Sequence, residues 1–331
     1  MKKTKFVTKL LSVLALCVIA ISSLVLAGCG KTPKDVAIYM PDGAPALAFA
    51  KLMHEDSQLG EKVTYTVVNA SDIGGKVATG EASVALMPVN AAAKLCGKGD
   101  KYKILSVNTH GNLYLLGKEV ITDVQALKGK KIGVVNLANV PGLTFKAILQ
   151  KNQIAYTSDE SALTDNNVYL KGVEATQIAA LLNATGNAKL DYVVAPEPQV
   201  SKLTTAAPVI KNVMSLQALW GEDSYPQAVL VVKKELAENT AFCNQLLNAL
   251  TESATWVKTN GQAAYAAIAS HTAEGYSTTL NPAVLTENAI TGCNIKVVKA
   301  SEMKSVIVDY LAKIMAVEPT SAATVSDDFF L

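Results

Sequence analysis

The chain has 331 residues, enough for about two domains of about 150 residues each. Half of its residues are hydrophobic and 18% are charged, a composition that argues against intrinsic disorder. The formal charge is +2, and all 30 basic residues are lysine. The balanced charge gives little support for nucleic-acid binding, and the lack of arginine excludes a bidentate guanidinium clamp.

The N-terminus has the features of a bacterial secretion signal. Positive charge comes first, from Lys2, Lys3, Lys5 and Lys9, and an uncharged apolar stretch follows at 10–26. The next residues, LAGC at 26–29, resemble the bacterial lipobox, in which the cysteine is lipidated and becomes the first mature residue. We therefore predict a signal peptide at 1–28, lipidation of Cys29 and a polar tether at 29–34. An uncleaved anchor helix is the alternative, and it would also hold the domain outside the membrane.

Removal of the predicted signal peptide changes the formal charge of the chain, and the predicted lipid anchor determines its compartment. Residues 1–28 contain four lysines and no acid, so the mature chain carries a formal charge of −2. Stable anchoring requires more than one acyl chain, as in bacterial lipoproteins. We expect a lipid-anchored protein on the extracytoplasmic face of the cell membrane.

The first half of the mature chain alternates strands with helices. Strands are predicted at 35–40, 63–68, 82–87, 103–107 and 113–117, and helices at 45–57, 72–80 and 91–95. A second series has strands at 130–135, 168–170, 191–195 and 208–213, and helices at 143–150 and 174–184. A strand at 227–232 returns the chain to the first half, and helices follow at 239–259, 262–270, 282–290 and 301–317.

This order predicts an α/β protein with two lobes, each a mostly parallel sheet covered on both faces. The first lobe would comprise residues 35–116 and 225–331, and the second 117–224. Ligands of such sheets lie beyond the carboxyl ends of the strands. Turn-rich loops follow the strands there, at 41–45, 88–90, 136–142 and 195–198. The alternative is that these are ordinary strand-to-helix turns.

Five segments, taken in order, resemble the solute-binding lipoproteins of ABC importers. They are DGAPA at 42–46, LKGKKIGV at 127–134, VAPEP at 194–198, YPQA at 225–228 and the tail 319–330. The most similar group is the type II family that binds sulfonates, taurine, nitrate or thiamine-pyrimidine precursors. The resemblance implies a type II periplasmic-binding-protein fold, whose lobes are joined by a two-strand hinge and close on a small molecule. It also implies delivery to a permease driven by a cytoplasmic ATPase.

The resemblance and the residues themselves give one set of candidate ligand contacts. The family's cleft loops match Gly43, Ala44, Pro45, Pro88, Asn90, 136–142 with Asn136, Asn139 and Gly142, and 195–197, while Tyr225 and Gln227 lie near the return crossing. The asparagines can both donate and accept hydrogen bonds, but turn formation is the favoured alternative for each of them. Glu197 is either a cleft acceptor or an acid that stabilises a helix N-terminus. Tyr39 and Trp220 are candidate aromatic contacts, with core or hinge packing as the alternative for Trp220.

Little in the sequence points to catalysis or metal binding. His54, His110 and His271 are widely separated, and no hydrolase or nucleotide-binding motif is present. The Cys-rich run of the family's pyrimidine-synthesising relatives is missing too. We expect a monomer without cofactor or metal that is not an enzyme. An enzyme on the same fold and a surface lipoprotein that senses or adheres are the alternatives.

The remaining cysteines, Cys96, Cys243 and Cys293, are expected to be small buried hydrophobes, although the sequence does not decide whether two of them form a disulfide.

The sequence defines the ligand less well. Without arginine, α-amino acids and dicarboxylates are disfavoured. Sulfonate or nitrate held by helix amides and lysine stays open. A neutral or weakly basic heterocycle contacted by Asn, Glu and aromatic residues fits slightly better.

Overall fold

The computed structural model describes residues 34–221 and 224–331, and Asp35–Leu331 forms one compact unit. The predicted signal peptide, the lipid-bearing Cys29 and the tether up to residue 33 lie outside the described residues. Within the part that is described, no helix is both long enough and apolar enough to cross a membrane.

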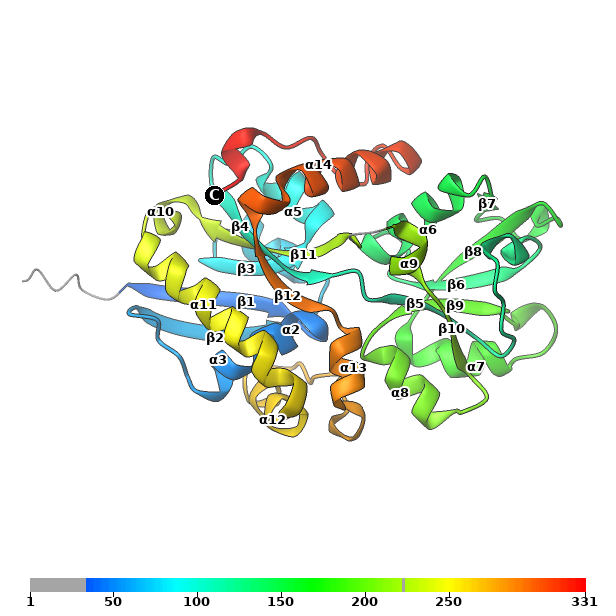
Figure 1. The fold of residues 1–331 in the computed structure, drawn as a ribbon, viewed down its shortest axis with the longest axis horizontal. Coiled ribbons are helices and arrows are strands. Elements are labelled where there is room, and N and C mark those ends of the chain that lie inside the picture. Colours follow the sequence, from blue (N-terminus) through cyan, green and yellow to red (C-terminus); the bar gives the residue numbers. More distant parts are fainter. Residues whose placement is uncertain (1–33, 222–223) are drawn as a thin grey trace, which may run out of the picture. The chain divides into compact units, whose positions relative to one another are not determined.

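Strands and helices alternate along most of this unit (Figure 1). The strands are β1 (Asp35–Pro41), β2 (Lys62–Val68), β3 (Val84–Pro88), β4 (Tyr102–His110), β5 (Leu113–Gly117), β6 (Lys131–Val135), β7 (Ala155–Thr157), β8 (Asn167–Val173), β9 (Tyr192–Pro196), β10 (Lys211–Ser215), β11 (Pro226–Lys233) and β12 (Ile295–Lys299). The α-helices are α2 (Ala44–Ala48), α3 (Ala50–His54), α4 (Ile73–Ala78), α5 (Val89–Cys96), α6 (Val140–Lys151), α7 (Ile178–Asn183), α8 (Gln199–Ala206), α9 (Leu216–Trp220), α10 (Lys234–Ala237), α11 (Thr240–Trp256), α12 (Gly261–Ser270), α13 (Glu287–Gly292) and α14 (Ala300–Val317). Short 3₁₀ turns are η1 (Val124–Leu127), η2 (Glu160–Ala162), η3 (Ala175–Gln177), η4 (Gly186–Ala188), η5 (Val257–Thr259), η6 (Pro282–Val284) and η7 (Asp327–Phe329).

The first sheet has the strand order β12-β4-β11-β3-β1-β2. β1 runs parallel to both β2 and β3, whereas β11 lies antiparallel between β3 and β4, and β12 pairs antiparallel with the outer edge of β4. The side chains of Val84–Met87 are all buried. A continuous apolar run of this kind is typical of a strand covered on both faces.

The second sheet has the order β10-β5-β9-β6-β8-β7. β6 is parallel to β8 and β9, while β5 is antiparallel to β9 and β10. This pairing places residues 113–116 in the second sheet, although the sequence analysis assigns them to the first lobe. The reason is that the chain leaves β4 directly after His110, and the apolar β5 is buried beside β9. We call the two sheets with their helices the first and second lobes.

Two chain crossings connect the lobes, as the resemblance implied. One consists of Gly111 and Asn112, and the other leads from α9 to β11. The Gly111 amide donates to Tyr225 O at 2.9 Å, and the Asn112 amide donates to Gln227 Oε1 at 3.3 Å. A Cβ on Gly111 would lie 2.6 Å from the Tyr225 ring, so only glycine allows the crossings to approach this closely.

The C-terminal helix also connects the lobes. Figure 1 shows α14, in orange and red, passing β4 and β11 and extending toward α6 of the second lobe. The hydroxyls of Thr144 and Tyr310 share a hydrogen bond of 2.8 Å, and Lys146 forms an ion pair with Glu318 at 2.6 Å. One buried apolar cluster accordingly includes Ile148 of α6 together with Ile307 and Leu311 of α14.

The observed elements differ from the expected ones in places. The helix predicted at 45–57 is divided at Phe49 into α2 and α3. The edge strands β7 and β12 and the helices α8 and α9 were not predicted. Cys96, Cys243 and Cys293 are buried, as expected, and none of the three forms a disulfide in the described structure.

Candidate functional site

A cavity of about 700 Å3 lies between the lobes, at the carboxyl edges of both sheets. Its wall in the first lobe is built from the loops that follow β1, β2 and β3, and its wall in the second lobe from those that follow β6, β8 and β9. Parallel strands place these loops at one edge of each sheet, which is why the sequence indicated four of them.

Eight of the thirteen predicted contact residues line the cavity. They are Gly43, Ala44, Pro45, Pro88, Asn136, Asn139, Glu197 and Gln227. Asn136 has a φ of 55°, a left-handed conformation that asparagine tolerates better than most residues. Its side chain therefore combines the turn role and the cavity position that the sequence left as alternatives.

Five predicted contacts lie outside the lining, and three of them have other partners or packing roles away from the hinge. The Tyr39 hydroxyl donates to Glu81 at 2.6 Å, and burial together with this carboxylate raises the pKa of Tyr39 to about 12. Asn90 is buried in α5 and donates to Ser321 O at 3.2 Å. Gly142 lies in α6, where a Cβ would be 1.9 Å from Leu137 O, so its role is close backbone packing.

Trp220 and Tyr225 are also absent from the lining and pack at the hinge. The Trp220 ring lies 5.5 Å from that of Tyr225 and 5.3 Å from that of Tyr310, measured between centroids. Tyr225 is fully buried, stacks on Tyr310 and donates its hydroxyl to Gln217 Oε1. These aromatic contacts hold the second crossing against α14.

Glu197 lies in the cavity wall and also contacts the first turn of a helix, so its position agrees with both alternatives that the sequence left open. Its side chain is 8% exposed and lines the cavity, and its carboxylate caps α8 by accepting from the Ser201 amide at 3.0 Å and the Ser201 hydroxyl at 2.9 Å. Burial raises the pKa of this carboxyl, and the two Ser201 hydrogen bonds oppose that shift.

Asp42 is an important residue that the sequence analysis did not select. Its carboxylate accepts hydrogen bonds from Tyr276, Thr278 and Thr279, the shortest being 2.6 Å from the Thr279 amide. These bonds hold the segment 276–281, which we call the rim segment, at the edge of the cavity, where Thr279, Leu280 and Asn281 line it. No periodic pattern in the sequence marks this segment.

Two buried polar residues, one at the end of β4 and one in the first crossing, line the cavity as well. Thr109 and Asn112 are each 1% exposed, and neither Thr109 Oγ1 nor Asn112 Oδ1 has a hydrogen-bond partner among the described residues. Buried polar atoms in proteins are usually hydrogen-bonded, and these two atoms are exceptions among the described residues.

The charges on the lining are mainly negative. Among the described residues of the lining, Asp42, Glu174 and Glu197 are acidic and Lys202 is the one base. Lys202 Nζ donates to Thr279 O at 3.1 Å, across the opening between α8 and the rim segment. The described lining contains no aromatic side chain, so the ring-stacking part of the heterocycle hypothesis finds no platform there.

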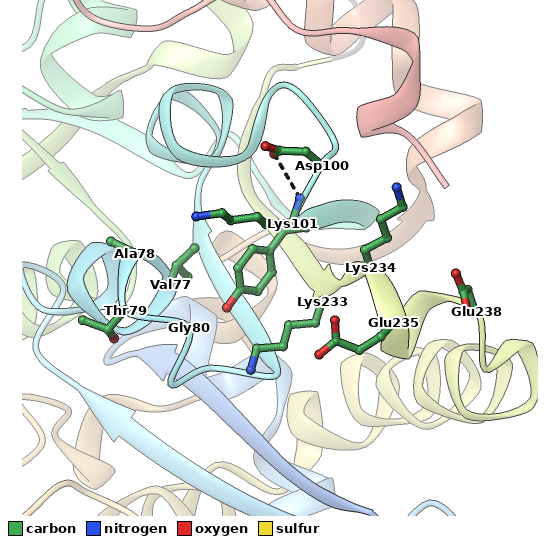
Figure 2. A pocket seen from close by; sticks show the side chains of 11 residues that line it. Val77, Ala78, Thr79, Gly80, Asp100, Lys101, Lys233, Lys234, Glu235 and Glu238 are labelled. Atoms are coloured by element: carbon green, nitrogen blue, oxygen red, sulfur yellow. Dashed lines mark hydrogen bonds between the residues drawn. The ribbon is translucent and has the colours of Figure 1, made fainter.

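A second hollow, of about 410 Å3, belongs to the first lobe alone. Figure 2 shows charged side chains of both signs around it, with Lys101, Lys233 and Lys234 beside Asp100, Glu235 and Glu238. It lies near the start of β4 and the end of the antiparallel β11. This end of the sheet is opposite the end that carries the cleft loops. Lobe closure could not enclose a ligand there.

Several solved structures share this architecture. An ABC transporter protein from Parabacteroides distasonis matches with a TM-score of 0.68 at 19% identity, covering 89% of this chain and 98% of that one. The periplasmic aliphatic sulphonate binding protein SsuA from Escherichia coli gives 0.66 at 12% identity, covering 91% and 92%. The chain has the fold of periplasmic binding proteins. This confirms the predicted fold class and agrees with the resemblance seen in the sequence.

The other comparisons limit what this likeness shows. No protein-family model matches the chain, and no curated protein sequence does. At such low identities, similarity establishes the fold and not the ligand. The structural neighbours are mostly transport binding proteins, but an enzyme, DszB, bound to biphenyl-2-sulfinic acid, also matches with a TM-score of 0.58 at 13% identity, covering 90% of this chain and 96% of that one.

Proposed function

We propose that this chain is a lipid-anchored, extracytoplasmic substrate-binding protein of an ABC importer. It captures a small molecule by lobe closure and delivers it to the permease. The observation that carries this proposal is the cavity of about 700 Å3 between two lobes connected by a two-strand hinge. Its volume lies within the range of about 300–1,000 Å3 that is usual for small-molecule sites.

The hinge supports a closing motion. Both lobes contribute to the cavity wall, so a ligand that touches both walls binds the closed form better than the open form. Such a difference in affinity is what shifts an equilibrium between two conformations. The contact of Lys202 with Thr279 lies at the opening and would break when the lobes separate.

A thermal-unfolding experiment tests the binding role. The full chain is extracted from membranes in detergent, and intrinsic fluorescence follows unfolding with and without the low-mass fraction of a cell extract. We expect the extract to raise the melting temperature, because a ligand of the folded state stabilises it. Mass spectrometry of the bound molecule before and after incubation should show it unchanged, whereas chemical conversion would favour an enzyme.

Two matched variants test whether the stabilisation by the extract comes from binding in the cleft. Ala175 lines the cavity and Ala188 is exposed in η4, outside the lining. Ala175→Trp should weaken the stabilisation by the extract, while Ala188→Trp should not. Equal effects of the two variants, or no stabilisation by any extract, would count against ligand capture in this cleft.

The anchor is tested separately by incorporation of labelled palmitate in cells. Cys29→Ser should abolish labelling, since Cys29 is the predicted lipid acceptor. Cys17 lies in the predicted signal peptide, so Cys17→Ser is the matched control and should leave labelling intact. Persistent labelling of the Cys29 variant would contradict the lipobox assignment.

A further inference from the structure

The two lobes touch on two flanks of the cleft, and the flanks differ in what holds them together. On the first, the α6–α14 flank, a single buried apolar cluster continues from one lobe to the other and includes Ile148, Ile307 and Leu311. Thr144 and Tyr310, whose hydroxyls share a hydrogen bond across this flank, are at most 1% exposed. Separating α6 from α14 would expose large apolar side chains to water, which is costly.

On the second, the α8–rim flank, α8 faces the rim segment and the adjacent η6, and no apolar cluster continues across. Leu280 of the rim segment belongs to a buried cluster whose described members all come from the first lobe. Val200 and Leu203 of α8 belong to a cluster whose described members all come from the second lobe. The exposed hydrogen bond from Lys202 Nζ to Thr279 O crosses between them. Exposed charged contacts contribute little to stability, so this flank separates more easily than the first.

A third contact between the lobes lies beside the chain crossings. The Tyr114 hydroxyl donates to Gly292 O at 3.3 Å, and Asn294 Nδ2 donates to Gly111 O at 3.0 Å. Tyr114 follows the first crossing by two residues, so this contact is close to a covalent connection between the lobes. Atoms near an axis of rotation move little. The crossings and the α6–α14 flank are therefore the parts about which the lobes can turn without losing their contacts.

The rim segment is firmly attached to the first lobe. Just before it, the Val67 amide of β2 donates to His271 O and the Ala273 amide donates to Val67 O, both at 2.8 Å. The Asp42 carboxylate then accepts the amide and the hydroxyl of Thr279. The carbonyl of Thr279 is thus held in place by the first lobe, while the ammonium that it accepts from belongs to the second.

We infer that the cleft opens on the α8–rim flank while α6 and α14 stay packed, and that Lys202 acts as a latch that holds this flank closed. Both Lys202 and Thr279 line the cavity, so a molecule that enters on this flank passes between them. The inference rests on the proposed function, because it gives the proposed lobe closure a direction and a residue that controls it.

Distances between pairs of spin labels test the direction of opening. Thr205→Cys with Ser277→Cys places one label on α8 and one on the rim segment, and Gln150→Cys with Ala316→Cys places the labels on α6 and α14. All four positions are exposed, whereas the native cysteines of the described part are buried. In the full chain in detergent, we expect the low-mass extract to shorten the α8–rim distance and to leave the α6–α14 distance nearly unchanged.

A substitution at Lys202 tests the latch. Lys202→Met keeps the apolar stem and removes the ammonium, so without extract it should raise the ratio of long to short α8–rim distances by about two- to fivefold, as expected for the loss of one exposed charged contact. Lys189→Met is the matched control, because Lys189 pairs with Asp191 within the second lobe. A lysine that only touched the ligand would leave this ratio unchanged in the absence of extract.

The rim segment provides a second test of the same contact. Asp42→Ala removes the carboxylate that holds Thr279, so the carbonyl is no longer fixed in front of Lys202. Adding Lys202→Met to the Asp42 variant should therefore change the distance ratio less than it does in the wild type. Equal effects of Lys202→Met in the two backgrounds would overturn the latch.

Two further results would overturn the inference: an α6–α14 distance that changes as much as the α8–rim distance, or a Lys202 variant that behaves like the Lys189 variant. The melting temperature separates the levels of failure. If the extract raises it while the distances contradict the inference, the chain binds a small molecule and only the site of opening is wrong. If the extract changes neither the melting temperature nor either distance, the proposed function fails together with the inference.

Discussion

Gly142 is held by the turn that precedes its own helix. A Cβ at this position would lie 1.9 Å from Leu137 O, a backbone atom that cannot move without shifting the cleft loop at 136–139. Gly142→Ala should therefore lower the free energy of unfolding, by at least the 1–3 kcal/mol or so that overpacking usually costs. Urea denaturation measures the change.

Gly75 provides the matched control. It lies in α4, and nothing comes within 4 Å of its Cβ position. Gly75→Ala should leave stability unchanged or raise it by about 0.5–1 kcal/mol, because alanine is the better helix former. An equal loss in both variants would show that the contact with Leu137 is not the cause.

His110 makes stability depend on pH. Its Nε2–H donates to Lys296 O at 3.0 Å, and burial lowers the pKa of the ring below its usual value. The folded state thus disfavours the protonated ring, so this stabilisation is present above about pH 6.5, the pKa of histidine in an unfolded chain. It is lost as the pH falls from there through the lower folded-state pKa.

The pH effect of His110 is measured as a difference between two proteins. Urea unfolding of the wild type and of His110→Gln between pH 5 and 8 should show a slope of up to about 1.4 kcal/mol per pH unit that only the wild type has. The comparison removes the opposite contribution of Glu197, whose pKa is raised by burial. Parallel curves for the two proteins would contradict the assignment.

Single residues differ in how well the sequence predicts their place. Gly43, Pro88 and Asn136 lie at or just after the ends of strands, and the direction of the strands determines which loops share an edge. Tyr39 and Trp220 were chosen for their chemistry, but side-chain direction and partners such as Glu81 and Tyr310 come from distant parts of the chain. Thr109 and Asn112 were missed because their burial depends on the crossing of two segments.

At the scale of elements, α14 and α6 are joined by one buried polar contact. Tyr310 and Thr144 share a hydrogen bond of 2.8 Å between their hydroxyls. Tyr310→Phe, Thr144→Val and the double variant form a cycle, in which we expect a coupling energy of about 0.5–1.5 kcal/mol. Additive losses in urea denaturation would mean that the two hydroxyls contribute independently.

The Asp42 carboxylate accepts four hydrogen bonds from the rim segment. Removing it in Asp42→Ala should speed amide exchange across 276–281 by about tenfold or more, since hydrogen bonds to a charged group are each worth about 1.5–3 kcal/mol. Hydrogen-exchange mass spectrometry follows this segment. Glu81→Ala is the control, because the partners of this carboxylate, Lys76 and Tyr39, lie outside the rim segment. Unchanged exchange in the Asp42 variant would contradict the anchoring role.

The elements themselves were predictable where the apolar pattern is long. The helix at 301–317 and the strand at 227–232 match α14 and β11 within a residue or two. The edge strand β12 has the sequence IKVVK, with charged and partly exposed positions, and β7 has three residues. Such strands form because a neighbouring edge is available, which local sequence does not report.

For the whole molecule, we expect closure of the two lobes on a ligand to change the fluorescence of Trp220. Its ring contacts Tyr225 of the second crossing and Tyr310 of α14, with Lys313 Nζ 5.3 Å from its centroid. Movement of the lobes changes these contacts, so the low-mass extract should alter the tryptophan emission. Trp220→Phe should lose the change, whereas Trp256→Phe should keep it, because Trp256 stacks on His54 within the first lobe. The reverse pattern would contradict motion at this hinge.

The order of strands has a consequence for the sequence in which the two lobes fold. Every strand of the second sheet comes from the continuous stretch 113–215, whereas the first sheet joins β1, at the start of the compact unit, to β12 at Ile295–Lys299. Pairings between distant residues form slowly, because a long loop must close first. A chain that emerges N-terminus first can complete its second lobe while the first still lacks β12 and α14. The half of the binding cleft that lies in the middle of the sequence is thus built first, and the half that contains both chain ends is built last.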